Sequence, residues 1–394
     1  MSYNRRLFFK HVAQTSDFPI GAEIIRASGI YLFGPSGEKF IDLVSGVSVS
    51  SLGHNNQKII EAIHVQTDNF LHLTVYGEFI QSPQVILARM LADNLPENLN
   101  CTYFVNSGSE AVEGAMKLAK RYTGRKEIIS FKNAYHGSTQ GALSILGDES
   151  FKKSFRPLLP QIRIINYNDF TDLSLISDKT AAVFVEPVQA EAGVVQPKMD
   201  FLKKLRKKCN ETGTLLVFDE IQTGMGRLGA LFAFEKYDVV PDILLTAKAL
   251  GGGMPLGAFI SSKKILDSFK TNPVLGHITT FGGHPVSCAA AIAMLKQVKN
   301  KKILDSVLIK EGLFKQLLVH EKIKEVRGEG LLLAVDLGKA ELVKKFVKKA
   351  IEKGIITEWF LFDDKSFRIS PPLNITQQEI RSVCKTILDI LSEF

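Results

Sequence analysis

Apolar residues follow two different spacings in the middle of the chain, which predicts helices and strands in alternation. Residues 109–122 and 200–212 carry apolar side chains at helical intervals. Short apolar runs bounded by turn residues predict strands at residues 127–131, 162–167, 181–187, 214–220 and 242–248. Because these runs are apolar throughout and alternate with helices, we expect a mostly parallel sheet covered on both faces.

The two ends of the chain follow a different pattern. Residues 29–46 predict a strand, a glycine-rich turn and a second strand, and the chain closes in a predicted helix at 376–393. We therefore predict an α/β protein with a large domain over residues 56–295. A smaller α+β domain would combine the N-terminal segment 1–55 with residues 296–394.

The composition is that of a soluble globular protein and excludes collagen, disordered chains and disulfide-rich miniproteins. Of 394 residues, 45% are hydrophobic and 23% charged. The net charge of +8 leaves a nucleic-acid binder as an alternative of a different class. The basic residues of 203–208 and 344–349, however, are interleaved with apolar residues at helical spacing. They indicate solvated helix faces, and we predict neither a nucleic-acid nor a membrane partner.

The cysteines and the N-terminus bear on the compartment. The four cysteines form no C-x-x-C pair and no zinc-spaced cluster with histidine, so we predict reduced core residues and no metal. The first residues lack the apolar core of a secretory signal, and no stretch reaches the roughly 20 apolar residues of a membrane span. We expect a cytoplasmic protein; a short transit peptide is the alternative.

Polar residues directly after the apolar runs are the first candidates for chemistry, since ligands bind beyond the carboxyl ends of parallel strands. Ser107 and Glu110 have the spacing of a helix-capping box, and Gly108 permits close approach of a ligand. The free N–H groups of such a helix start form an anion site. A helix cap with nothing bound is the alternative.

Two further strand ends carry a carboxylate and an amine. Asp219 closes one apolar run and needs a cation or a donor if it is buried; a cap or an ion pair would also satisfy it. Lys248 closes another run and precedes three glycines. In apolar surroundings its amine has a lowered pKa and attacks carbonyl groups, although a lysine that reaches the surface is the alternative. A phosphate cradle, a carboxylate for a protonated ring nitrogen and an amine for an aldehyde together match pyridoxal 5'-phosphate.

At these residues the sequence resembles the class III (subgroup II) pyridoxal-phosphate aminotransferases, the acetylornithine, ornithine and 4-aminobutyrate group. The likeness runs from about residue 20 to the C-terminus, with the motifs in family order. They are NSGSEAVEGAMKLAKRYTGR, AYHGST, VEPVQAEAGVVQP, LLVFDEIQTGMGRLG, PDILLTAKALGGGMPLGA, TTFGGHPVSCAAA and FRISPP. The resemblance implies a PLP-dependent transferase of fold type I.

The resemblance also implies a role for each matching residue. Lys248 would bind the cofactor aldehyde and then move a proton as acid and base, while Asp219 would pair with the ring nitrogen. The remaining cofactor contacts would be Ser107, Gly108 and Ser109 at the phosphate, Ile221 and Tyr135 on the ring faces, Gln222 near the phenolic oxygen, and His136 and Glu186 close by. Thr280 would reach the phosphate in the neighbouring subunit, which implies a homodimer with shared active sites.

The substrate side of the resemblance rests on two residues. Arg368 matches the arginine that grips a substrate carboxylate, and Glu191 matches the glutamate that pairs with it when the donor is an ω-amine. Ser138 stands where the ornithine and acetylornithine branch usually has arginine, which weighs against that donor class. We predict a ping-pong transaminase that moves an amino group from an amino acid or ω-amine to a keto acid, with 2-oxoglutarate as the expected acceptor. A PLP-dependent aminomutase, racemase or decarboxylase on the same fold is the alternative.

Overall fold

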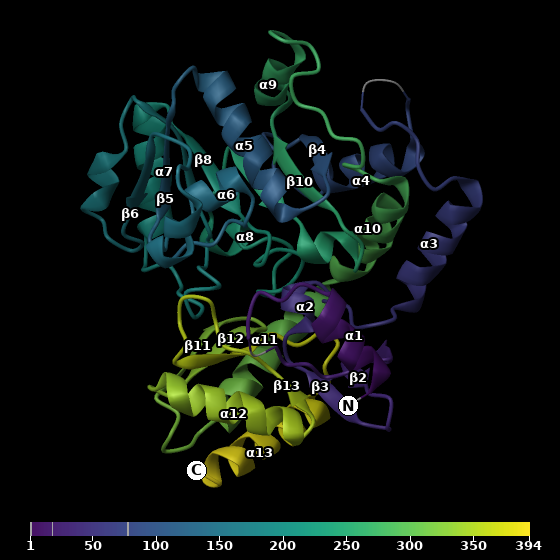
Figure 1. Cartoon of the computed structure of the whole chain (residues 1–394). Coiled ribbons are helices and arrows are strands. Elements are labelled where there is room, and N and C mark those ends of the chain that lie inside the picture. The colour runs from purple at the N-terminus through teal and green to yellow at the C-terminus, as the bar shows by residue number, and fades with distance from the viewer. Residues whose placement is uncertain (1, 18, 77–78) are drawn as a thin grey trace.

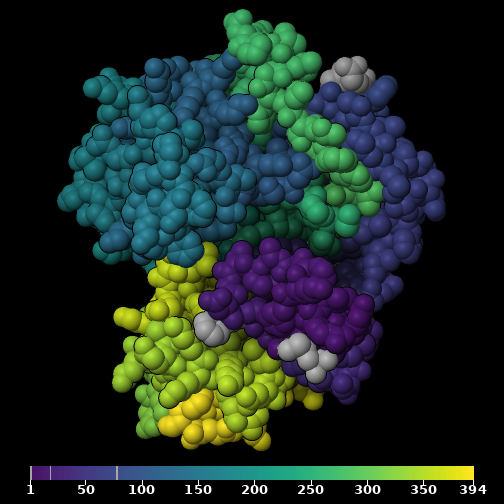
Figure 2. Space-filling model, viewed as in Figure 1, coloured from purple at the N-terminus to yellow at the C-terminus, as the bar shows by residue number. Residues whose placement is uncertain are grey.

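The computed structural model describes residues 2–17, 19–76 and 79–394, and it has two bodies (Figure 1). The upper body contains the middle of the chain. The lower body brings both ends of the chain together, as the purple and yellow surfaces show (Figure 2). This arrangement agrees with a small domain made from both termini, and the boundaries at residues 55 and 295 remain our proposal.

A seven-stranded sheet organises the upper body. Its strands are β4 (Cys101–Val105), β5 (Glu127–Phe131), β6 (Ile162–Ile165), β7 (Thr180–Val185), β8 (Leu215–Asp219), β9 (Ile243–Thr246) and β10 (Gly257–Ser261). Their order is β4-β10-β9-β8-β7-β5-β6, and β10 alone runs antiparallel to both of its neighbours. The predicted α/β class with a mostly parallel sheet is therefore confirmed.

Helices cover both faces of this sheet, as the continuous apolar strands predict. The helices of the upper body are α3 (Gln57–Asn69), α4 (Ser82–Ala92), α5 (Gly108–Thr123), α6 (Gln140–Ser144), α7 (Phe201–Thr212), α8 (Phe234–Tyr237), α9 (Lys263–Leu266) and α10 (Pro285–Val298). Alternate residues of β7 belong to different core clusters: Ala182 and Phe184 pack with α5, whereas Val183 and Val185 pack in the cluster that holds α7 and α10. Five short 3-10 turns join these elements: η1 (Glu149–Phe151), η2 (Lys153–Phe155), η3 (Asp172–Leu175), η4 (Lys248–Gly251) and η5 (Asp267–Lys270).

The lower body contains two smaller sheets. One pairs N-terminal strands with a C-terminal strand in the order β1 (Arg26–Ser28), β2 (Tyr31–Phe33), β3 (Lys39–Asp42) and β13 (Ile355–Ile356). The other is β11 (Glu325–Glu329), β12 (Leu332–Asp336) and β14 (Ser366–Ile369). The helices here are α1 (Tyr3–His11), α2 (Ser45–Ser48), α11 (Lys301–Leu317), α12 (Ala340–Glu352) and α13 (Gln377–Ser392).

The predicted elements match the structure closely, with one informative difference. The helices predicted at 109–122, 200–212 and 376–393 are α5, α7 and α13. The strand predicted at 242–248 ends at Thr246, and Lys248 instead opens the turn η4 with a left-handed φ of 46°. The chain leaves the sheet before Lys248. The direction of the lysine side chain is therefore not set by the alternation of side chains between the two faces of a strand.

The turn α2 has an unusual backbone. All four of its residues, Ser45 to Ser48, have positive φ values between 49° and 66°. Asp42 supports the start of the turn, because its Oδ1 accepts hydrogen bonds from the N–H groups of Val44 and Ser45 at 2.8 Å. The turn packs against η4, the segment that begins with Lys248.

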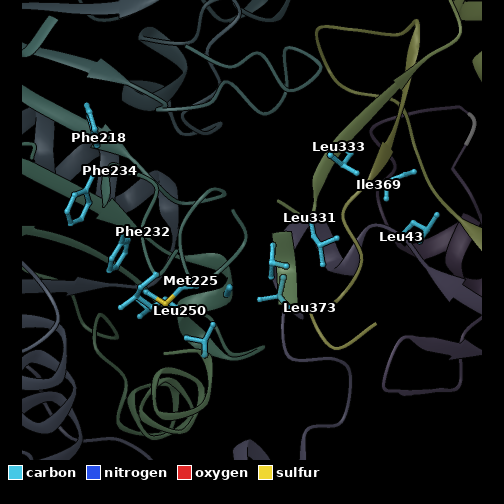
Figure 3. Packing of buried hydrophobic residues seen from close by; sticks show 14 of the residues in the cluster. Leu43, Phe218, Met225, Phe232, Phe234, Leu250, Leu331, Leu333, Ile369 and Leu373 are labelled. Carbon is cyan, nitrogen blue, oxygen red and sulfur yellow. The ribbon is translucent and has the colours of Figure 1, made fainter. Parts of the chain in front are cut away.

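A buried arginine joins the two bodies. Arg227 is fully buried, and its guanidinium donates to the carbonyls of Leu331 and Pro371 at 3.0 and 2.6 Å and to the hydroxyls of Ser45 and Ser51 at 3.3 and 2.9 Å. Burial lowers its pKa to about 9. Apolar side chains of both bodies surround this joint: Figure 3 shows Phe218, Phe232, Met225 and Leu250 of the upper body and Leu43, Leu331, Ile369 and Leu373 of the lower body.

Candidate active site

A cavity of about 180 Å³ lies at the carboxyl edge of the large sheet, where the parallel strands end. Its walls come from the segments that follow β4, β5, β7, β8 and β9. The lining residues are Ser107, Gly108, Ser109, Tyr135, His136, Gly137, Glu186, Asp219, Ile221, Gln222, Thr223 and Lys248. Every candidate cofactor residue of the sequence analysis except Thr280 therefore lies on one cavity.

The start of α5 forms one end of the cavity. Ser107 is the N-cap residue, and its hydroxyl accepts a hydrogen bond from the N–H of Glu110 at 3.2 Å. The predicted capping box is only half right. The Glu110 carboxylate binds the backbone N–H and the side-chain amide of Asn106, at 2.7 and 2.8 Å, instead of the N–H of Ser107. The other free N–H groups at the start of this 16-residue helix are donors suited to an anion.

Two glycines keep this end of the cavity open. A Cβ on Gly108 would lie 2.8 Å from the Cδ1 of Ile221. A Cβ on Gly137, whose φ is +126°, would lie 2.1 Å from the hydroxyl of Ser109. Only glycine at these positions leaves Ile221 and Ser109 where they line the cavity.

Asp219 is paired with a histidine inside the protein. Its Oδ2 lies 2.7 Å from Nδ1 of His136, and its Oδ1 accepts the N–H of Ile221 at 3.1 Å. Burial lowers the pKa of His136, but the hydrogen bond and charge of Asp219 outweigh burial and raise that pKa above 6.5. Nε2 of His136 is buried and has no hydrogen-bond partner among the described residues. His136 thus orients the carboxylate that the sequence singled out.

Lys248 is half-buried at the cavity, among polar and charged side chains. Its Nζ donates to Oε1 of Gln222 at 2.8 Å. Burial lowers the pKa of Lys248, and the charges of Glu191 and Asp219 oppose that shift. The lysine therefore loses its proton more readily than a surface lysine, which favours the nucleophilic form.

Glu186 closes another side of the cavity. Its two oxygens accept the backbone N–H groups of Tyr135 at 2.9 Å and Ala190 at 3.1 Å. Burial raises the pKa of Glu186 to about 7, although the neighbouring His136 lowers it. The carboxylate fixes the loop that carries Tyr135 against the strand end of β7.

Arg368 and Glu191 lie beside the cavity but not on its lining. Nη2 of Arg368 contacts both oxygens of Glu191, at 2.7 and 2.8 Å, and the ring of Phe360 lies 4.5 Å from the guanidinium carbon. Burial raises the pKa of Glu191, but the charges of Arg368 and Lys248 and the hydrogen bond from Arg368 lower it overall. The predicted pair thus exists in this chain. We call Arg368, Glu191, Phe360 and the neighbouring Glu358 the Arg368 corner.

Thr280 is apart from the cavity of its own chain. It is exposed, in a stretch where Ile278 and Phe281 are also exposed. The contact of Thr280 with the cofactor of a neighbouring subunit stays a prediction.

Sequence reasoning missed three residues. Gly137 and Thr223 line the cavity, and both stand inside motifs quoted for the resemblance, so the motifs contained the signal. Glu358 lies 3.5 Å from Nε of Arg368, and no motif or spacing marks it in the sequence. Among residues 2–17, 19–76 and 79–394, no group of three or more potential ligands could hold a metal ion, and no helix is long and apolar enough to cross a membrane.

Comparison with known proteins places the chain in a family. The aminotransferase class-III family matches residues 12–391. The chain is 39% identical to an acetylornithine aminotransferase of Clostridium acetobutylicum (90% of this chain and 92% of the relative) and 38% identical to a putrescine aminotransferase of Pectobacterium atrosepticum (98% and 85%).

A solved structure agrees with these relatives. The ornithine aminotransferase of Toxoplasma gondii superimposes with a TM-score of 0.90 at 30% identity, over 98% of this chain and 94% of that one. These three relatives share a reaction but are named for different amino donors. The chain therefore belongs to the class III aminotransferases and is a pyridoxal-phosphate-dependent transaminase of fold type I.

Proposed function

We propose that the cavity holds pyridoxal phosphate and that the enzyme transfers an amino group from an amino acid or ω-amine to 2-oxoglutarate. The observation that carries this proposal is that three different groups converge on one cavity. The start of α5, the Asp219 carboxylate and the Lys248 amine line the same cavity, and each suits a different part of the cofactor. The two glycines that keep the cavity open, Gly108 and Gly137, support the fit.

The cofactor, when bound, supplies a reactive aldehyde carbon and a ring that takes up electrons. Asp219 would hold the protonated ring nitrogen, and His136 would hold Asp219 in place through the 2.7 Å contact. Ser107, Gly108 and Ser109 would bind the phosphate, with Ile221 and Tyr135 on the two ring faces and Gln222 and Glu186 at the edge. Lys248 Nζ, made less basic by burial, would take a proton from the amine-bearing carbon of the substrate and deliver it to the former aldehyde carbon of the cofactor.

The Arg368 corner would bind the carboxylate of the keto acid. The guanidinium of Arg368 suits a carboxylate, and in this structure it pairs with the carboxylate of Glu191. Glu191 would have to move aside for a keto acid and would stay for an ω-amine. One site would then serve both partners of a ping-pong reaction.

We further propose a cytoplasmic homodimer in which Thr280 reaches the partner's cofactor. Exposed apolar residues near Thr280 support such an interface: Ile278 and Phe281 on its own segment, and Val85 and Ile86 on α4. The Gln84 amide of α4 donates to the carbonyl of Gly283 at 2.6 Å, which brings α4 close to that segment. The four cysteines are free, as suits a reducing compartment.

Half-reactions test this function. The purified enzyme, loaded with pyridoxal phosphate, is mixed with one amino donor and no acceptor. We expect the spectrum to change to that of the aminated cofactor, release of an aldehyde or keto product, and reversal on addition of 2-oxoglutarate. A donor that only loses carbon dioxide or changes chirality would instead establish a decarboxylase or racemase, and a rearranged amine would establish an aminomutase.

A further inference from the structure

Arg368 is flanked by two carboxylates rather than one. Glu191 occupies Nη2, and Oε1 of Glu358 lies 3.5 Å from Nε. Arg368 and Glu191 are 1% and 6% exposed at their side chains, whereas Glu358 is 34% exposed. Glu358 is therefore the member of this group that a ligand from solvent can reach.

The backbone fixes Glu358 in this place. The N–H of Arg368 donates to the carbonyl of Glu358 at 2.8 Å, and the next residue, Trp359, pairs with Phe367 as an antiparallel bridge. The two charged residues therefore stand opposite each other across two paired segments. Their proximity follows from the fold and not only from one rotamer of a long side chain.

Charges of both signs surround Glu358. Burial is the largest cause of its raised pKa, and the charges of Glu191 and Asp42 add to this, while Arg368 and Lys248 oppose it. No described residue donates a hydrogen bond to its carboxylate. A cation that entered this corner would find a carboxylate with unused acceptor capacity.

A substrate carboxylate meets the opposite situation. A two-point contact with Arg368 needs two free N–H groups, and Glu191 holds Nη2. Even after Glu191 moves aside, Glu358 stays beside the guanidinium through the backbone pairing.

We propose that Glu358 is a specificity-determining residue that selects amino donors which bring no carboxylate to Arg368, namely primary ω-amines and diamines. The inference rests on the proposed function, since it names the donor class of that site. The second ammonium group of a diamine would bind Glu358. Glutamate and 2-oxoglutarate would bind more weakly than they would without Glu358.

The experiment compares the wild-type holoenzyme with Glu358→Gln and with Asp364→Asn. Asp364 is an exposed carboxylate on the same connection between β13 and β14, and the ion pairs of Arg368 are with Glu191 and Glu358, so Asp364 controls for the loss of one charge. Two quantities are measured: kcat/KM for the half-reaction with putrescine, and the dissociation constant of glutarate, an unreactive dicarboxylate, by calorimetry.

We expect opposite shifts. Glu358→Gln should bind glutarate about fivefold more tightly and lose about fivefold in kcat/KM for putrescine, since a partly exposed ion pair is worth up to about 1 kcal/mol. Asp364→Asn should stay within about twofold of wild type in both. A purely structural role of Glu358 would weaken both quantities together, and that result, or no change, would overturn the proposal.

Two further outcomes separate the hypotheses. If the wild type turns over no donor in half-reactions, the proposed function fails and this inference fails with it. If the wild type is active but the preference does not move in Glu358→Gln, only this inference fails. Should Glu358→Gln not fold, Glu358→Asp is used, which withdraws the carboxylate by one methylene. Smaller shifts in the same opposite directions, tighter glutarate binding and lower kcat/KM for putrescine, support the proposal. Shifts that weaken both quantities overturn it.

Discussion

The cavity around Lys248 and the Arg368 corner both contain buried charges, but they are assembled differently. The cavity takes its polar groups from successive strand ends of a single sheet, and several of these groups keep unused capacity, such as Nε2 of His136. In the Arg368 corner, an arginine on β14 pairs with carboxylates from two other segments, although Nε and Nη1 of Arg368 have no hydrogen-bond partner among the described residues. The first arrangement is ready for one fixed ligand, and the second must rearrange when its ligand changes.

Removal of the lysine tests the cavity most severely. Lys248→Ala should lower turnover by about 10⁴-fold, because both the attacking amine and the proton carrier disappear. The free energy of unfolding of the cofactor-free protein should not fall, because the substitution also removes the free-energy cost of burying the amine. Turnover and urea unfolding are the measurements, with Lys345→Ala on the exposed face of α12 as the control. Retained turnover would remove Lys248 from the chemistry.

A smaller change at the cavity wall should separate cofactor binding from folding. Gly137→Ala forces a Cβ to within 2.1 Å of the Ser109 hydroxyl at a φ of +126°. We expect affinity for pyridoxal phosphate to fall by about 10- to 100-fold, equivalent to roughly 1–3 kcal/mol of strain. Gly124→Ala is the matched control, because φ is also positive there but a Cβ meets no atom within 4 Å. Equal affinity in the two variants would contradict binding of the cofactor at the end of the cavity that Gly137 and Ser109 line.

A third prediction concerns pH. The pKa of His136 is raised in the folded protein, so its pair with Asp219 stabilises the fold fully below pH 6.5. This contribution is lost as the pH rises through the higher folded pKa. At pH 6, His136→Asn should cost about 1.5–3 kcal/mol of unfolding free energy, the range for hydrogen bonds to charged groups. The cost should shrink toward pH 9 in cofactor-free protein. A cost independent of pH would mean that folding does not raise the pKa of His136.

The sequence was sufficient for the cavity because its residues follow the strands of a parallel sheet. Asp219 ends β8, Ser107 precedes α5, and both stand where the apolar pattern stops. The sequence singled out Lys248, which lines the cavity. Its place on a left-handed turn after β9 was not predictable, since that backbone depends on tertiary contacts with α2 and α10. The antiparallel insertion of β10 between β4 and β9 was missed for the same reason.

The Arg368 corner shows where sequence reasoning ends. A family motif marked Arg368, and the resemblance supplied Glu191. Glu358 stands in a short connection with no periodicity, and it reaches Arg368 only because the segment folds back on β14. Pairings of this kind are decided by packing of the whole body and leave no local trace.

Arg227 has a consequence for how the enzyme can be divided. One guanidinium of the upper body supplies hydrogen bonds to residues from both the first 51 and the last 64 positions of the chain. If the lower body were produced alone, two carbonyls and two hydroxyls in its interior would lose their donor, and the shared apolar joint would face water. The two bodies are therefore expected to melt in a single transition, and attempts to exchange the lower body between related enzymes should carry Arg227 and its acceptors together.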